Sequence, residues 1–169
     1  MKKILNKQGS INIWLVVIVF IFLGTAVLIM DFGSLYMNNK AVKEGLNRAV
    51  KAAALAINEN EQLAEGIFMI DPIRAEVNFK QILAENIGLN EITLEPLPGG
   101  SLVTEKPEIK ELIIENSTPT AYYSPTLKNS FTLEHPSALA VIQVKVKGLY
   151  SSKVFTLYKL SSSQLTSIY

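Results

Sequence analysis

The sequence predicts an α+β protein, with a long N-terminal transmembrane-plus-stalk helix, a second short helix and then an antiparallel β-sheet. Three observations predict this order. The 169 residues are 49% hydrophobic and only 18% charged, and the apolar excess is concentrated near the N-terminus. A helical repeat of apolar residues follows that stretch, and alternating apolar residues fill the C-terminal half. We therefore divide the chain into a short cytoplasmic basic segment (1–10), a transmembrane helix (11–30), a continuous helical stalk (31–66) and an extracytoplasmic α+β domain (67–169).

The transmembrane helix is predicted from the residues between Ile13 and Met30, which include no charged side chain. About twenty helical residues cross a hydrocarbon core of roughly 30 Å. Trp14 near one end and Tyr36 beyond the other suit the two membrane interfaces. The membrane-anchor residues are Ile13, Trp14, Leu15, Val16, Val17, Ile18, Val19, Phe20, Ile21, Phe22 and Leu23.

Two other interpretations of this stretch remain. One is a cleaved secretory signal, because Gly24 and Ala26 have the spacing of a small-x-small cleavage site. The apolar run continues past that site to Met30, which favours an anchor. The other is a buried core helix, which is disfavoured because apolar residues occupy every face.

The orientation is predicted with the N-terminus in the cytoplasm. Lysines and arginines are nearly balanced across the span, so the positive-inside rule does not decide it. The segment before the span is very short, whereas a whole domain follows it. Long domains translocate largely regardless of charge. Asp31, where the apolar run ends, either marks the outer interface or pairs with a cation of a neighbouring subunit.

A heptad seam follows the span and predicts that the helix continues to about Asn58 or Leu63. Alanines are strong helix formers, so propensity and pattern agree. Small seam residues suit packing either against the chain's own domain or among identical helices, and the second option would make a homo-oligomer. The residues of this seam are Leu35, Val42, Leu46, Ala49, Ala53 and Ala56.

The second helix is predicted over residues 72–87. Asp71 suits the N-cap, Pro72 the first helical position and Gly88 a left-handed C-cap. The apolar positions that predict its buried face are Ile73, Val77, Phe79, Ile82, Leu83 and Ile87.

The remaining chain predicts short antiparallel strands separated by turn-forming residues. We place them at 92–94, at 109–114, around Tyr122 and Tyr123, at 139–146 and at 154–160. In the strand at 139–146, odd and even positions are expected to face opposite sides of the sheet.

No pattern predicts catalysis, a cofactor or a metal site. The single histidine, His135, precedes a proline at a strand edge, and cysteine is absent. The acidic cluster of Glu59, Glu61 and Glu65 lacks the spacing of a calcium loop. A net charge of +1 without a basic stripe gives no reason to expect nucleic acid.

The first third of the chain resembles the N-terminal segment of the TadE/TadG-like proteins of Tad (Flp-type) pilus systems. Those chains have a basic start, a Gly-Ser or Gly-Ala step, one apolar span, an aspartate and an alanine-rich helix. Here Gly9 and Ser10 precede the span, Asp31 ends it, and residues 46–56 match the alanine-rich helix. The resemblance implies a pilin-like fold and prepilin processing between Gly9 and Ser10.

Two positions depart from the family pattern. Lys51 stands where the family helix usually has aspartate, and Trp14 stands where the fifth mature residue of the TadE type is glutamate. The resemblance therefore implies a minor-pilin-like or assembly component rather than a major filament subunit. Its partners would be membrane lipid and other pilus or secretion proteins. The alternatives are a membrane-tethered binding or sensor domain unrelated to pili, and a secreted enzyme released by signal peptidase.

Overall fold

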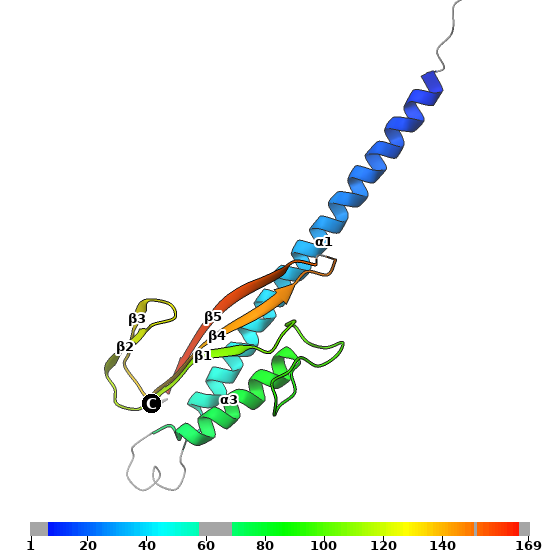
Figure 1. The fold of residues 1–169 in the computed structure, drawn as a ribbon. Helices are drawn as coiled ribbons and strands as arrows, with labels where there is room; N and C mark the ends of the chain where they lie inside the picture. The colour runs from blue at the N-terminus through cyan, green and yellow to red at the C-terminus, as the bar shows by residue number, and fades with distance from the viewer. Residues whose placement is uncertain (1–6, 58–68, 151, 166–169) are drawn as a thin grey trace, which may run out of the picture.

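The computed structural model describes residues 7–57, 69–150 and 152–165, with backbone only for residues 7–12. Two helices and five strands follow in the predicted α+β order, so the fold class is confirmed (Figure 1). The helices are α1 (Lys7–Ala54) and α3 (Pro72–Ile87), and the strands are β1 (Glu108–Glu115), β2 (Thr120–Ser124), β3 (Asn129–Leu133), β4 (Ser137–Lys147) and β5 (Val154–Gln164).

The main sheet has three antiparallel strands in the order β1-β4-β5, with β4 in the centre. Even-numbered residues of β4, from Ala138 to Val146, belong to the core shared with the helices. Leu139 and Val141, on the other side of the strand, are also fully buried. Both faces of the central strand are therefore covered, although only one meets the helices.

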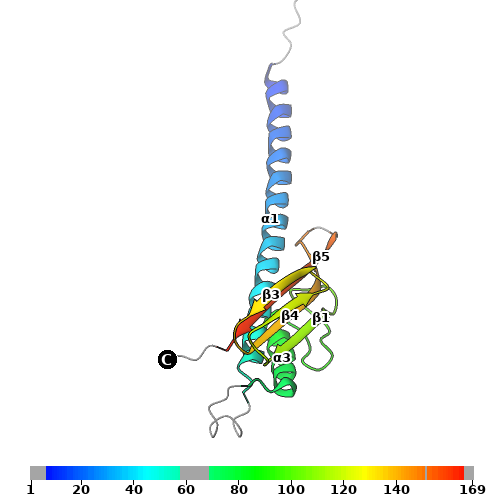
Figure 2. The ribbon, with the colours of Figure 1, turned by 90° about the vertical axis from the view of Figure 1, so that its left-hand side faces the viewer.

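The helical layer consists of α3 and the C-terminal half of α1, which pack on each other and against one face of the sheet (Figures 1 and 2). Phe79, Leu83 and Ile87 of α3 are fully buried. Gly45 allows the close approach of the helices, because a Cβ there would lie 2.7 Å from Cγ2 of Ile87. The C-terminal half of α1 is thus part of the hydrophobic core of the domain.

The opposite face of the sheet is covered by the antiparallel hairpin β2–β3 (Figure 2). Its first strand contains the predicted Tyr122 and Tyr123. The second strand was not predicted from the sequence, although Phe131 and Leu133 alternate with polar residues there. Leu133 is buried, which agrees with an inward-facing end of the hairpin.

The prediction that α1 continues to Asn58 or Leu63 is wrong, because the helix ends at Ala54. Ile57 forms an antiparallel bridge with Ile70, and the Asp71 N–H donates to the Ala56 carbonyl over 2.8 Å. These tertiary contacts override the helix propensity of the alanines. The remainder of the predicted stalk, residues 58–66, lies outside the described residues.

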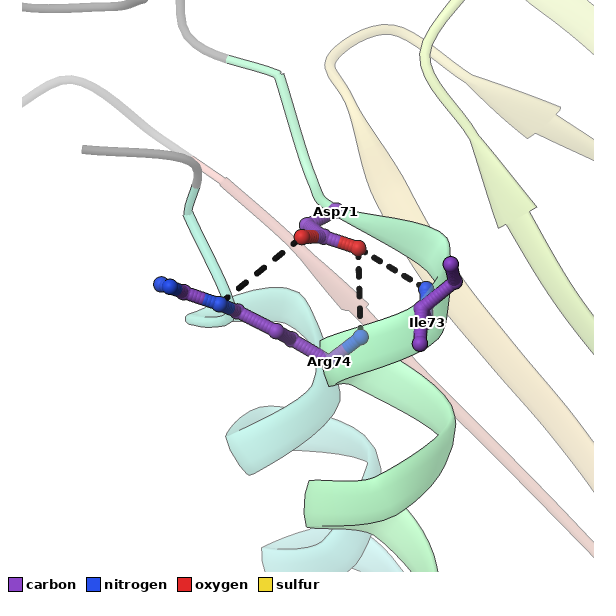
Figure 3. A network of polar contacts seen from close by, with 3 residues as sticks. All are labelled: Asp71, Ile73 and Arg74. Atoms are coloured by element: carbon purple, nitrogen blue, oxygen red, sulfur yellow. Dashed lines mark hydrogen bonds and ion pairs between the residues drawn. The ribbon is translucent and has the colours of Figure 1, made fainter. Parts of the chain in front are cut away.

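The predicted caps of α3 are both present. The Asp71 carboxylate accepts hydrogen bonds from the backbone N–H groups of Ile73 (2.9 Å) and Arg74 (3.2 Å), and it faces the Arg74 guanidinium (Figure 3). Gly88 has φ +74° as a left-handed C-cap. The predicted buried face was partly wrong, since Ile73 and Val77 are 78% and 58% exposed. The predicted Phe79, Leu83 and Ile87 are buried, and Ala75 lies inward in place of Ile73 and Val77, because small and i+4-spaced residues allow close helix packing.

Removing the cap by Asp71→Ala is expected to lower the free energy of unfolding by about 1 kcal/mol, because two backbone donors of the first turn lose their acceptor. Urea unfolding of the detergent-solubilised protein measures the loss. Glu76→Ala, farther along the exposed face of α3, is the control and should change stability by less than about 0.5 kcal/mol. Equal effects of the two substitutions would contradict the capping role.

The strand predicted at 92–94 is also wrong. The Asn90 side chain accepts hydrogen bonds from the backbone N–H groups of Ile92 (3.0 Å) and Thr93 (2.9 Å), which closes a turn. Ile92 is 92% exposed. Asparagine side chains commonly form such turns, and here that local bond outweighs the β propensity of two β-branched residues.

Candidate functional site: the exposed apolar helix and its junction with the domain

The N-terminal half of α1 projects from the domain as a bare apolar helix (Figures 1 and 2). Among the described residues, one helix is long and apolar enough to cross a membrane. Its 18-residue apolar window has a mean hydropathy of 3.0 and is not buried at all. The window is therefore not a core helix of this chain, and its length and composition are compatible with a single-pass membrane protein.

The predicted anchor residues, Ile13 to Leu23, are all exposed, from 40% at Val17 to 72% at Phe22. A continuous apolar surface of this kind is far larger than the isolated patches of soluble proteins. Gly9 and Ser10, the predicted processing position, lie in the first turns of α1, where only the backbone is described.

The predicted seam is covered by the chain's own domain. Leu35 is partly buried against the core, and the others (Val42, Leu46, Ala49, Ala53 and Ala56) are buried within it. Ala56 lies just beyond the end of the helix. Small seam residues suit packing either against the chain's own domain or among identical helices. In the structure the seam packs against the domain.

Asp31 lies at the junction between the apolar half of α1 and the domain. Its Oδ1 accepts a hydrogen bond from the backbone N–H of Tyr150, at 2.8 Å, in the connection between β4 and β5. Gly148 of the same connection passes so close that a Cβ there would lie 2.2 Å from Asp31 Oδ1. The aspartate therefore joins the start of the domain-bound part of α1 to the end of a β-hairpin more than a hundred residues away.

Gly148→Ala is expected to separate this junction, because the added methyl group displaces the Asp31 carboxylate and breaks its hydrogen bond to Tyr150. The core is not touched, so the global free energy of unfolding should fall by no more than about 1 kcal/mol. Hydrogen exchange of the Tyr150 amide should become faster. Gly100→Ala, where a Cβ meets nothing within 4 Å, is the control and should leave that amide protected.

Polar side chains of α1 also fix its position along the edge strand β5. Lys43 donates through Nζ to the Leu160 carbonyl, and the Ser161 hydroxyl donates to Asn47 Oδ1 at 2.8 Å. Burial, and then the neighbouring charge of Lys159, lower the pKa of Lys43 below its ordinary value. These bonds fix the rotation of α1 about its axis relative to the sheet. They therefore also fix the direction in which the apolar half of α1 leaves the domain.

A buried carboxylate joins the sheet to the hairpin on its other face. Glu111 of β1 is 7% exposed. It accepts hydrogen bonds from the Tyr122 hydroxyl (3.1 Å), the Ser124 hydroxyl (2.9 Å) and the Thr126 N–H (2.8 Å). Desolvation raises the pKa of Glu111, but the hydrogen bonds from Thr126, Ser124 and Tyr122 together outweigh it and hold the pKa below its ordinary value. Glu111 could not be singled out from the sequence, because a single glutamate in a strand carries no motif.

The other chemically interesting side chains are not brought together. His135 is exposed at the turn before β4. Within residues 7–57, 69–150 and 152–165, no three histidines or carboxylates gather as a metal site. The predicted acidic cluster at residues 59, 61 and 65 lies outside the described residues. The features that the structure does assemble are therefore a bare helix and its junction with a small domain.

Comparison with known proteins adds no relative: the chain matches no protein-family model, no curated protein and no solved structure.

Proposed function

We propose that this chain is a single-pass, membrane-anchored component of a Tad/Flp-type pilus or a related secretion apparatus. Its role would be minor-pilin-like or in assembly, without catalysis. The observation that carries the proposal is the division of α1 into an exposed apolar half and a half that forms the core of an α+β domain. The order of Gly9-Ser10, apolar span, Asp31 and alanine-rich helix supports the pilus part.

The physical role of α1 in this proposal is that of a rigid connection. Its 48 residues extend about 72 Å at 1.5 Å per residue. The apolar half binds membrane lipid, and the other half is held by the core and by polar bonds to β5. The domain would then be presented to partner proteins at a fixed height and rotation. Because the seam is already covered, contacts with pilus proteins or a second copy would use other surfaces of the domain.

The mass of the mature N-terminus tests which processing occurs. Intact-protein and N-terminal peptide mass spectrometry of the native membrane protein would give a start at Ser10 for prepilin processing or at Met1 for an unprocessed anchor. A mature start at Val27 would leave most of the span behind and would contradict the anchor.

The proposed orientation places the domain outside the cell membrane and the N-terminus in the cytoplasm. The chain has no native cysteine, so single-cysteine variants can be labelled without background. Ile92→Cys, at a side chain that is 92% exposed, should react with an impermeant maleimide on intact cells. Ser10→Cys should react only after lysis, and the reverse pattern would overturn the orientation.

A membrane-tethered extracytoplasmic binding or sensor domain is the second candidate. One observation favours it: the small-residue seam is covered by the chain's own domain, so in this structure the helix offers no free seam for packing among identical helices. Neighbouring genes separate the two candidates. A secretion ATPase, a prepilin peptidase and TadB/TadC-like membrane proteins would support the pilus function, and their absence would support the sensor.

A further inference from the structure

The turn between β4 and β5 lies beside α1 at the point where the apolar stretch of the helix ends. Both ribbon views show this turn at the end of the domain nearest to the bare half of α1 (Figures 1 and 2). The hydrogen bond from the Tyr150 N–H to Asp31 fixes it there. We call the four apolar side chains around this turn the hairpin tip: Leu149, Tyr150, Val154 and Phe155.

The hairpin tip is exposed although it is apolar. Leu149 and Tyr150 are 63% and 60% exposed, and Val154 and Phe155 are 48% and 40% exposed. Such residues at a turn would normally be polar, since turns lie at the surface. Their neighbours on α1, such as Leu28 and Phe32, are also apolar and exposed. The tip and the helix together form a largely apolar surface, with Asp31 and Lys153 at the same place.

Two hollows lie between the tip and α1, and each is lined by residues of both. One, of about 390 Å³, is lined by apolar side chains of α1 and by Tyr150 and Phe155 of the tip, and also by Asp31 and Lys153. The other, of about 440 Å³, lies between Leu149 and a stretch of α1 from Met30 to Asn38. Tyr150 and Phe155 therefore border the same hollow as Val27, four residues before Asp31, whereas Leu149 lies beside the part of α1 around and after Asp31.

The helix sets the depth of the tip. Val27 lies about 6 Å closer to the membrane centre than Asp31, at 1.5 Å per residue. Interfacial protein segments bury their apolar side chains about 5–10 Å into the boundary between headgroups and acyl chains. A tyrosine with an exposed ring suits that depth, and the exposed Lys147 at the end of β4 can extend its amine toward headgroups.

We infer that the hairpin tip inserts into the outer interface of the same phospholipid bilayer that α1 crosses. The inference rests on the anchoring part of the proposed function and goes beyond it, because it adds a second membrane contact from the folded domain. With two contacts, the domain is held against the bilayer in one orientation. The occupant is lipid rather than a protein partner, because Tyr150 and Phe155 border the end of the apolar span and Leu149 lies just beyond it, which is the level of the interface.

Tryptophan fluorescence tests the inference, because Trp14 is the chain's single tryptophan. The full chain is reconstituted in phosphatidylcholine vesicles whose acyl chains carry bromine, which quenches tryptophan at short range. Four proteins are compared: the unaltered chain, and Trp14→Phe combined in turn with Leu149→Trp, with Tyr150→Trp and with Ile92→Trp. Trp14→Phe with Tyr150→Trp serves as a second tip variant, and circular dichroism confirms that each protein is folded.

Trp14 should be quenched by the brominated lipid. Both tip variants should show blue-shifted tryptophan emission. Bromine near the headgroup end of the acyl chains should quench most of that emission, and bromine near the chain ends should quench less. The variant at position 92 should respond only to aqueous acrylamide.

Two results together would overturn the inference: Trp14 is quenched by brominated lipid, but the tip variants are quenched only by acrylamide, as the variant at position 92 is. The membrane anchor would still be supported. Tip variants protected from both lipid bromine and acrylamide would also overturn it, since a protein partner or a second copy would then cover the tip. An unquenched Trp14 would contradict the anchor itself and the inference with it.

Discussion

A variant with three arginines in the middle of the apolar span is expected to lose membrane insertion. Its substitutions are Phe20→Arg, Ile21→Arg and Gly24→Arg. Each arginine near a span centre costs about 2.5–3.5 kcal/mol on insertion scales, so three cost roughly 7.5–10.5 kcal/mol. The remaining apolar residues contribute roughly 3–7 kcal/mol in favour, at about 0.3–0.6 kcal/mol each. Insertion therefore becomes unfavourable. Fractionation of cells should move the variant from the membrane to the soluble or aggregated fraction.

The control carries leucine at the same three positions. It changes side-chain size without adding charge, so it should remain in the membrane fraction as the unaltered protein does. Because the three positions are exposed, a normal membrane level of the arginine variant would show that this helix is not the anchor.

Glu111→Ala is expected to destabilise the domain by about 3 kcal/mol. The substitution removes the acceptor of three hydrogen bonds, and each bond to a charged group contributes about 1.5–3 kcal/mol, part of which water recovers at the less buried donors. The Ser124 hydroxyl is fully buried and loses its acceptor. Urea unfolding in detergent measures the change, and Glu111→Gln, which keeps one acceptor oxygen, should lose less.

Glu108→Ala is the matched control on the same strand. Glu108 forms an exposed ion pair with Lys110, and such pairs contribute about 0–1 kcal/mol. A loss at Glu108 as large as that at Glu111 would contradict the role of the buried carboxylate.

The same carboxylate predicts a pH dependence. The pKa of Glu111 is lower in the folded protein than in the unfolded chain, so its stabilising contribution is complete above the ordinary carboxyl pKa of about 4.3. The contribution is lost as the pH falls through the folded value. The urea midpoint of the unaltered protein should therefore decline more steeply below pH 4.3 than that of Glu111→Gln, and parallel declines would contradict the assignment.

The parts of the fold that could be predicted from the sequence are those specified by local chemistry. Asp71, Pro72 and Gly88 set both ends of α3, because caps act within one turn of the helix. The alternation along β4 follows from the period of a strand. The exposed apolar half of α1 follows from composition alone.

The parts that could not be predicted depend on residues far apart in the sequence. The end of α1 at Ala54 is set by pairing between Ile57 and Ile70. The junction at Asp31 depends on Gly148, which in the sequence only separates two strands. Periodicity placed Phe79 correctly but also placed Ile73 and Val77 on the buried face of α3, whereas close packing against α1 buries Ala75 instead of these two.

Alkaline carbonate extraction of membranes that contain the unaltered protein tests the central claim most directly, because it strips peripheral proteins and leaves transmembrane helices in the lipid. The account predicts that the full-length protein stays in the membrane pellet and dissolves only when detergent is added. Release of the full-length protein into the carbonate supernatant would contradict a membrane-spanning α1.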